Sequence, residues 1–176
     1  MMTQPLKIGV LGSGPAGQTL ATGFLDKGHP VMIGSRDSTK LDGWLHHAGP
    51  GAQIGSFAET AEFGDVVLLS VLGSAAEDVV RLAGVENLTG KIVIDATDPL
   101  DFSSGQPGLF VGTTDSLGER VQRIVPGAYV VKALNIVQAD VMINPRLTGD
   151  EPDMFIAGGS DEAKHTVTQL LREFGW

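Results

Sequence analysis

The sequence contains no cysteine among its 176 residues. This absence excludes disulfides, thiolate metal sites and cysteine nucleophiles, and it fits a reducing, cytoplasmic environment. No apolar run approaches the length of a membrane span. The N-terminus has no basic region followed by a long apolar stretch, so we expect neither a membrane anchor nor a signal peptide.

Positive charge is also scarce. Only 12 Lys and Arg residues stand against 21 Asp and Glu residues, giving a formal net charge of −9. Such an acidic chain lacks the electrostatic footprint of a protein that binds nucleic acid or an anionic membrane. A polyanionic ligand would therefore have to be held by local basic groups and backbone amides.

Glycine, by contrast, is abundant, with 24 residues that cluster where apolar runs meet helix-like segments. Strands are predicted over 6–11, 30–34, 52–54, 65–71, 91–95, 128–134 and 153–157, and helices over 15–27, from 38, 58–62, 75–82, 116–124 and after 160. This alternation indicates an α/β fold, a Rossmann-type doubly wound parallel sheet in a three-layer α/β/α arrangement. We expect residues 1–176 to form one such domain. The Pro-, Gly- and Ser-rich segment 98–112 is predicted to be a functional loop.

The first predicted strand leads into a glycine-rich loop of the G-x-G-x-x-G type, which opens the first helix. Its residues are Gly12, Ser13, Gly14, Pro15, Ala16 and Gly17. In this motif the first glycine allows a tight turn, the second lets backbone amides approach a pyrophosphate, and the third lets the helix pack on the sheet. The strand–loop–helix context therefore predicts a dinucleotide-binding site at the positive end of the helix.

The end of the second predicted strand indicates which dinucleotide is bound. An NAD-selective domain usually has Asp or Glu there, which accepts hydrogen bonds from the ribose hydroxyls. This chain has Ser35 followed by Arg36, with Lys40 one helical turn later. A hydroxyl, a guanidinium and an ammonium group suit a 2′-phosphate, so the sequence favours NADP(H) over NAD(H), although such charges can also be ordinary solvated surface residues.

Four polar residues outside these motifs were considered for other roles. Asp95 and Asp98 flank the end of a predicted strand that faces the cofactor, where they could contact substrate, but Asp98 before Pro99 also suits a turn. Lys132, in an apolar strand, could serve either a buried ion pair or the active site. His29 follows a helix end, and we expect it to be solvated.

The sequence resembles the coenzyme F420-dependent NADP oxidoreductase family. The resemblance is carried by Lys7–Gly14, Gly34–Arg36 with Lys40, Val67–Val71, Val93–Leu100 and Val131–Asn135, which follow in order along nearly the whole chain. It implies that Ser13–Ala16 line the pyrophosphate and that Ser35, Arg36 and Lys40 hold the 2′-phosphate. It also implies that Ser70, Val71 and Leu72 line the ribose near the nicotinamide, and that Ala133 and Asn135 lie beside the nicotinamide ring.

The family resemblance implies hydride transfer between NADP(H) and a second redox cofactor, either F420 or a flavin, as the small-molecule redox substrate. Such a transfer needs little from side chains, so we assign no catalytic residue and no metal ligand. Two alternatives stay open, a reductase of a small organic substrate and a non-enzymatic NADP(H) sensor. Family members that use F420 carry further C-terminal helices, so we expect this chain to lack that extension. The family tendency implies a homodimer.

Overall fold

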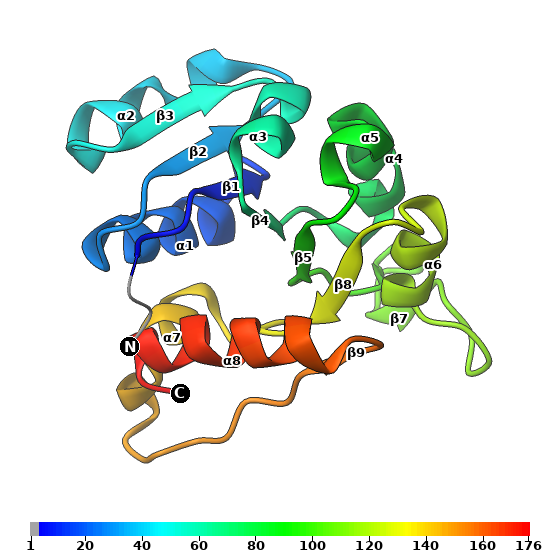
Figure 1. Ribbon diagram of the computed structural model, residues 1–176. Helices are drawn as coiled ribbons and strands as arrows, with labels where there is room; N and C mark the ends of the chain where they lie inside the picture. The colour runs from blue at the N-terminus through cyan, green and yellow to red at the C-terminus, as the bar shows by residue number, and fades with distance from the viewer. Residues whose placement is uncertain (1–3) are drawn as a thin grey trace.

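The computed structural model describes residues 4–176 and contains a seven-stranded sheet with the order β3-β2-β1-β4-β5-β8-β9 (Figure 1). Its strands are β1 (Ile8–Leu11), β2 (Val31–Gly34), β3 (Ala52–Gly55), β4 (Val66–Leu69), β5 (Ile92–Asp95), β8 (Tyr129–Lys132) and β9 (Ala157–Gly158). The first six pair in parallel, and β9 pairs antiparallel to β8. The predicted Rossmann-type sheet is therefore confirmed, with one antiparallel strand at its edge.

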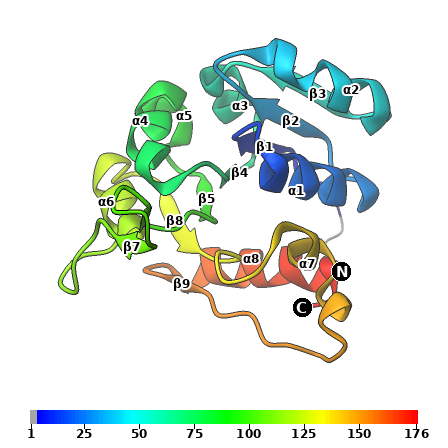
Figure 2. The same cartoon turned by 180° about the vertical axis from the view of Figure 1, so that it is seen from behind.

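The helices form two layers, one on each face of this sheet (Figure 2). They are α1 (Pro15–Asp26), α2 (Asp42–Ala48), α3 (Phe57–Phe63), α4 (Gly73–Ala83), α5 (Val85–Leu88), α6 (Leu117–Ile124), α7 (Ala139–Ile143) and α8 (Asp161–Phe174). Buried side chains of α1, α7 and α8 share one hydrophobic cluster with the sheet, and those of α3, α4, α5 and α6 share the other. Every residue of β1 and β4 is buried, as expected for central parallel strands covered on both sides.

Glycines mark the ends of α1 and α8 and the point where α1 crosses α7. Gly28 and Gly175 follow α1 and α8 with φ of +87° and +103°, a backbone conformation that glycine adopts at little cost. Gly23 lies where α1 crosses α7, since a Cβ atom there would come within 2.6 Å of Ile143. Among residues 4–176, no helix combines the length and hydrophobicity that a membrane span needs.

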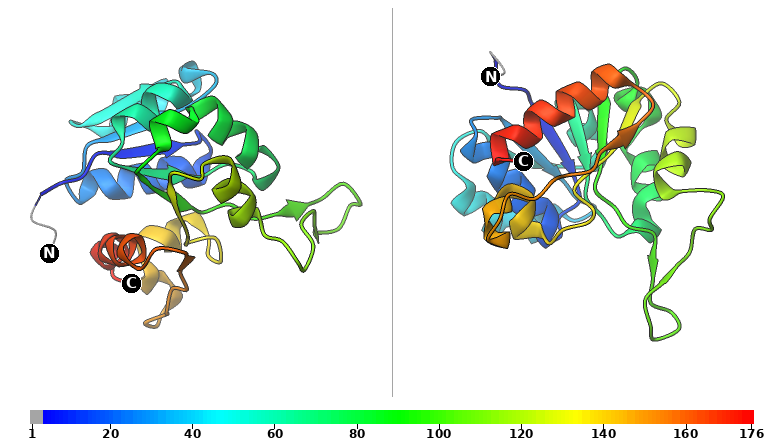
Figure 3. Two further views of the ribbon diagram at one scale, coloured as in Figure 1. Left: turned by 45° about the vertical axis from the view of Figure 1, so that its right-hand side comes forward. Right: turned by 90° about the horizontal axis from the view of Figure 1, so that it is seen from below.

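The sequence-based prediction was wrong about the last strand and incomplete about two loops. Residues 153–156 are irregular, and β9 occupies only Ala157–Gly158. The loop 98–112 contains a small antiparallel hairpin, β6 (Leu100–Asp101) and β7 (Gly108–Leu109), which extends away from the body of the molecule in Figure 3. Helix α7 was not predicted, because its five residues are too few to show a helical period.

His29 was predicted to be solvated, but only 3% of its surface is exposed. Its Nδ1 accepts a hydrogen bond from the backbone N–H of Leu6 at 3.0 Å, and its Nε2 lies 2.8 Å from Oε2 of Glu173 on α8. The imidazole therefore links the start of β1 to the last helix. The prediction failed because Glu173 is 144 positions away in the sequence.

Candidate functional site

The glycine-rich loop between β1 and α1 has the close packing that its motif predicts. Gly12 has a φ of +135°, and a Cβ atom there would lie 2.0 Å from the carbonyl oxygen of Ser70 at the end of β4. A Cβ atom on Gly17 would lie 2.2 Å from the carbonyl oxygen of Gly12. Larger residues at these two positions would push the helix and the neighbouring strand away from the turn.

Gly14 differs from these two glycines because a Cβ atom there would meet no other atom within 4 Å. It lies at the N-cap of α1, where no side chain caps the helix and Pro15 occupies the first turn. The backbone hydrogen bonds of the described residues provide no acceptor for the N–H groups of Ala16 and Gly17. The start of α1 thus offers free amide donors beside open space, which is the arrangement that binds an anion at a helix N-terminus.

The predicted selectivity residues lie directly beside this loop. The side chain of Ser35 is nearly buried, and its Oγ donates to Oγ of Ser13 at 3.1 Å, which joins the end of β2 to the glycine-rich loop. Arg36 and Lys40 are exposed, and neither forms an ion pair with any residue between 4 and 176. Both positive side chains are therefore available to a ligand at this edge of the sheet.

Asp37 is the only acidic residue within this short segment. Its carboxylate accepts hydrogen bonds from the hydroxyl and the backbone N–H of Thr39, at 2.6 and 3.2 Å. These hydrogen bonds, the hydroxyl first, lower the pKa of Asp37. The carboxylate caps the N-terminus of the short 3₁₀ helix Ser38–Leu41, which contains Lys40.

A cavity of about 670 Å³, called here the crevice cavity, opens next to the glycine-rich loop. It lies beyond the carboxyl ends of β4, β5 and β8, the usual position of ligands in an open α/β sheet. Its lining comes from these strand ends, from the hairpin and from α7, and includes Ala16, Val71, Leu72, Ala96, Asp98, Leu100, Asp101, Phe102, Phe110, Asn135, Val137 and Met142.

Three residues predicted to lie near the nicotinamide, Val71, Leu72 and Asn135, line this cavity, and Leu72 is 79% exposed. The other two residues, Ser70 and Ala133, do not line this cavity. Ser70 is buried, with its carbonyl against the glycine-rich loop, and Ala133 is fully buried in the core. The sequence predicts a functional loop over 98–112, but it does not single out the lining side chains of this loop or of α7, because these apolar side chains carry no motif and reach the cavity only in the folded chain.

The backbone at Leu134 explains how Asn135 reaches this cavity. Leu134 is the only non-glycine residue with positive φ, +68°, among residues 4–176, and its side chain is fully buried. A left-handed conformation at a residue with a branched side chain costs about 1–2 kcal/mol, so packing must hold it there. The turn directs Asn135 toward Asp98, whose Oδ1 accepts from Nδ2 of Asn135 at 2.9 Å.

Lys132 forms the buried ion pair that was one of its two predicted roles. Its Nζ lies 3.1 Å from Oδ2 of Asp95 and also donates to the carbonyl oxygen of Thr97. The other carboxylate oxygen of Asp95 accepts from the backbone N–H and the hydroxyl of Thr97. Asp95 is fully buried and does not line the crevice cavity, so both charged groups hold the end of β5 against β8.

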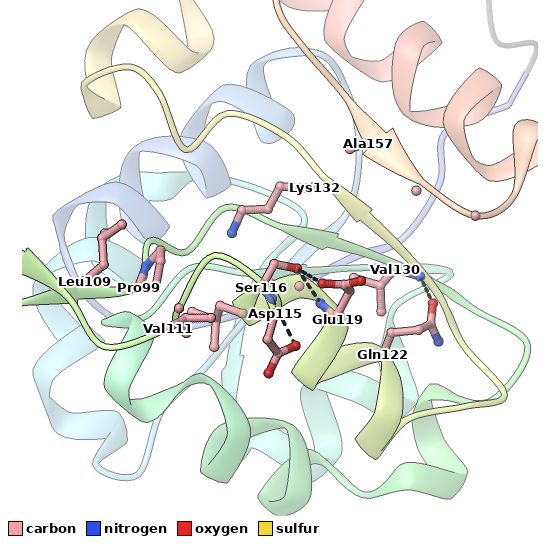
Figure 4. A pocket seen from close by; sticks show the side chains of 15 residues that line it. Pro99, Leu109, Val111, Asp115, Ser116, Glu119, Gln122, Val130, Lys132 and Ala157 are labelled. Atoms are coloured by element: carbon pink, nitrogen blue, oxygen red, sulfur yellow. Dashed lines mark hydrogen bonds between the residues drawn. The ribbon is translucent and has the colours of Figure 1, made fainter.

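A second cavity, of about 580 Å³, lies between the hairpin, α6 and the β8–β9 edge, and it shares no lining residue with the crevice cavity (Figure 4). Lys132 lies at its wall, where its amine is engaged by Asp95. Asp115 is held by Arg120 and Arg123, each at 3.0 Å, and these contacts, Arg120 first, lower the pKa of Asp115. No residue of the glycine-rich loop lines this cavity, so the candidate site is the crevice cavity.

Comparison with known proteins identifies the family of the chain. The family model described as "NADP oxidoreductase coenzyme F420-dependent" matches residues 7–99, more than half of the chain. The F420-dependent NADP reductase of Methanothermobacter marburgensis is 31% identical over 96% of this chain and 80% of its own length. The chain belongs to the F420-dependent NADP oxidoreductase family. It is therefore placed among NADP-dependent oxidoreductases.

Two other similarities extend over nearly all of the chain. A crystal structure of a candidate F420-dependent NADP-reductase from Arthrobacter sp. FB24 superposes with a TM-score of 0.92 at 39% identity, covering 97% of this chain and 81% of that one. The metalloreductase STEAP3 of Rattus norvegicus is 29% identical over 97% of this chain. The chain spans only 32% of that relative, so this similarity concerns one part of a longer protein.

Proposed function

We propose that the chain transfers a hydride between NADP(H), bound along the glycine-rich loop, and a second redox cofactor in the crevice cavity, either F420 or a flavin. The observation that carries this proposal is the position of the cavity, whose wall shares Ala16 with the start of α1. A nicotinamide that continues from a pyrophosphate at this helix would reach the cavity, as ligands do at the carboxyl ends of parallel strands.

In this proposal the NADP(H) molecule crosses the sheet edge from β2 to β8. The segment Ser13–Ala16 lines the pyrophosphate, which accepts hydrogen bonds from the free N–H groups at the start of α1, and Ser35, Arg36 and Lys40 hold the 2′-phosphate. Ser70, Val71 and Leu72 lie toward the ribose next to the nicotinamide. Ala133, by its backbone, and Asn135 belong to the segment beside the ring. Arg36, which is exposed and forms no ion pair within residues 4–176, and the open space at Gly14 support these assignments.

Hydride transfer to a flavin-type ring requires geometry more than acid–base groups. The cofactors would supply the chemistry when bound, NADPH as the hydride donor and the second ring as the acceptor of that hydride and of a proton from solvent. The protein contributes apolar walls that stack the two rings and exclude water from the space between them. Phe102 and Phe110 of the hairpin segment and Val137 beyond β8 provide such walls in the crevice cavity.

The test is a titration with NADPH and NADH, followed by anaerobic mixing of NADPH with F420, with FMN and with riboflavin. We expect tighter binding of NADPH than of NADH, and loss of NADPH absorbance with at least one acceptor. Tight NADPH binding without turnover of any of them would contradict the proposal and favour the sensor. Reduction of a small organic carbonyl or imine with no turnover of the ring cofactors would favour the other alternative.

A further inference from the structure

The crevice cavity presents hydrogen-bond acceptors to a ligand but no cation. Among the described residues, no lysine, arginine or histidine lines it, and its two charged side chains are Asp98 and Asp101. Both carboxylate oxygens of Asp101 already accept a hydrogen bond within the protein, Oδ1 from the backbone N–H of Ser103 at 2.8 Å and Oδ2 from its hydroxyl at 2.9 Å. These hydrogen bonds, the backbone one first, lower the pKa of Asp101.

Asp98 differs from Asp101 because half of its carboxylate is free. Oδ1 accepts from Nδ2 of Asn135 at 2.9 Å, and Oδ2 accepts no hydrogen bond from any residue between 4 and 176. The backbone of Asp98 is fixed by close packing, since a Cβ atom on Gly73 at the start of α4 would lie 1.9 Å from its carbonyl oxygen. The carboxylate of Asp98, a residue that lines the cavity, is therefore held in a defined position by its backbone and by Asn135.

A carboxylate oxygen without a hydrogen-bond donor, in a cavity with largely apolar walls, favours ligands that carry a hydrogen-bond donor. It stabilises a ligand group that brings an N–H donor, and it repels a phosphate or carboxylate placed directly against it, because no lysine, arginine or histidine among the described residues lines the cavity. A quinone, which is neutral and has no N–H group, gains nothing from Asp98. The cavity thus suits an uncharged nitrogen heterocycle whose anionic tail, if any, stays outside.

We propose that Asp98 is a specificity-determining residue that accepts a hydrogen bond from a ring N–H of the second substrate, with Asn135 holding the carboxylate in position. This inference rests on the proposed function. In a flavin or deazaflavin ring the matching donor is N3–H of the pyrimidinedione portion. The contact orients the ring against the nicotinamide and leaves phosphate-bearing tails in solvent.

The test compares lumiflavin, which has no phosphate, with N3-methyllumiflavin, which lacks the N–H donor. Their binding to the protein–NADP⁺ complex is measured by quenching of flavin fluorescence. With the native chain, we expect N3-methylation to raise the Kd at least about tenfold, the size expected for a hydrogen bond to a charged group. In Asp98→Ala, the two flavins should bind with Kd values within about twofold of each other.

Asp101→Asn is the matched control, because it removes the same charge from the same cavity. It should keep the ratio of Kd values seen in the native chain. If Asp98→Ala does not fold, as judged by thermal unfolding, Asp98→Asn replaces it, and its ratio should fall at least about threefold because a neutral acceptor forms a weaker hydrogen bond.

Two outcomes would overturn the assignment, and they differ. If lumiflavin binds and is reduced by NADPH but Asp98→Ala keeps the native ratio, the role of Asp98 is wrong and the proposed function stands. If the NADP⁺ complex binds neither flavin and F420 is not reduced, the proposed function fails together with this inference.

Discussion

Replacing Arg36 by alanine should weaken the binding of NADPH much more than that of NADH. Arg36 directly follows β2, is exposed, and has no acidic partner among the described residues. The preceding Ser35 is tied to Ser13 of the glycine-rich loop, so the start of this segment is fixed relative to the proposed pyrophosphate site. The guanidinium can therefore engage a 2′-phosphate without first breaking an ion pair.

The size of the effect follows from the exposure of Arg36. Hydrogen bonds to charged groups contribute about 1.5–3 kcal/mol, and solvent screening at an exposed position brings the value to the lower end. A loss of about 1.4 kcal/mol corresponds to a roughly tenfold rise in the Kd of NADPH. NADH has a hydroxyl group in place of the 2′-phosphate, so its Kd should change less than about twofold.

Fluorescence titration of both nucleotides at low and high salt measures this difference. Arg81→Ala is the control, because it removes another exposed arginine, from α4, where its partners are Glu77 and Asp78. That variant should bind both nucleotides as the native chain does. An equal loss of NADPH and NADH affinity in Arg36→Ala would refute the proposed contact with the 2′-phosphate.

Three further predictions concern stability and the glycine-rich loop. Gly12→Ala should lower the free energy of unfolding in urea by about 3 kcal/mol, because the new Cβ atom would lie 2.0 Å from the carbonyl oxygen of Ser70 and the backbone has a φ of +135°. Gly14→Ala, where a Cβ atom meets nothing within 4 Å, should leave the stability of the protein unchanged but weaken its binding of NADPH. Lys132→Met should lower the free energy of unfolding by about 3 kcal/mol in the same assay, because it leaves the buried carboxylate of Asp95 without its cation. The double variant Lys132→Met, Asp95→Asn should regain part of this loss of stability. If it regains none, the pairing of these two residues is contradicted. Because the pKa of Asp115 is lowered in the folded chain, its carboxylate contributes fully to the free energy of unfolding above about pH 4, and this contribution is lost as the pH falls through the lowered pKa. The difference in unfolding free energy between the native chain and Asp115→Asn should therefore persist at neutral pH and shrink in acid.

The glycine-rich loop shows what could be predicted from short stretches of sequence. The conformations of Gly12 and Gly17 depend on a turn that the motif itself specifies, and the apolar runs on either side need only local periodicity to be recognised. The short strand β9 shows the opposite case. Its two residues pair antiparallel with β8 because the irregular chain before them returns along the sheet edge, a path that no local pattern encodes.

The crevice cavity could not be predicted from short stretches of sequence. Asp98 and Asn135 are 37 positions apart, and they meet because β5 and β8 are neighbours and Leu134 adopts a left-handed turn. The hairpin and α7, which close the cavity with apolar side chains, carry no recognisable motif. Their role follows from packing alone.

The Rossmann-type sheet, the glycine-rich turn and the basic residues after β2 can be recognised from the sequence, because each follows from residues close together in the chain. The folded chain was needed to see which polar groups line the crevice cavity, such as Asp98 and Asn135, and which form an ion pair with each other instead, such as Asp95 and Lys132. The physical reason is that a side chain's partners are set by which strands become neighbours, and those contacts join residues distant in the sequence.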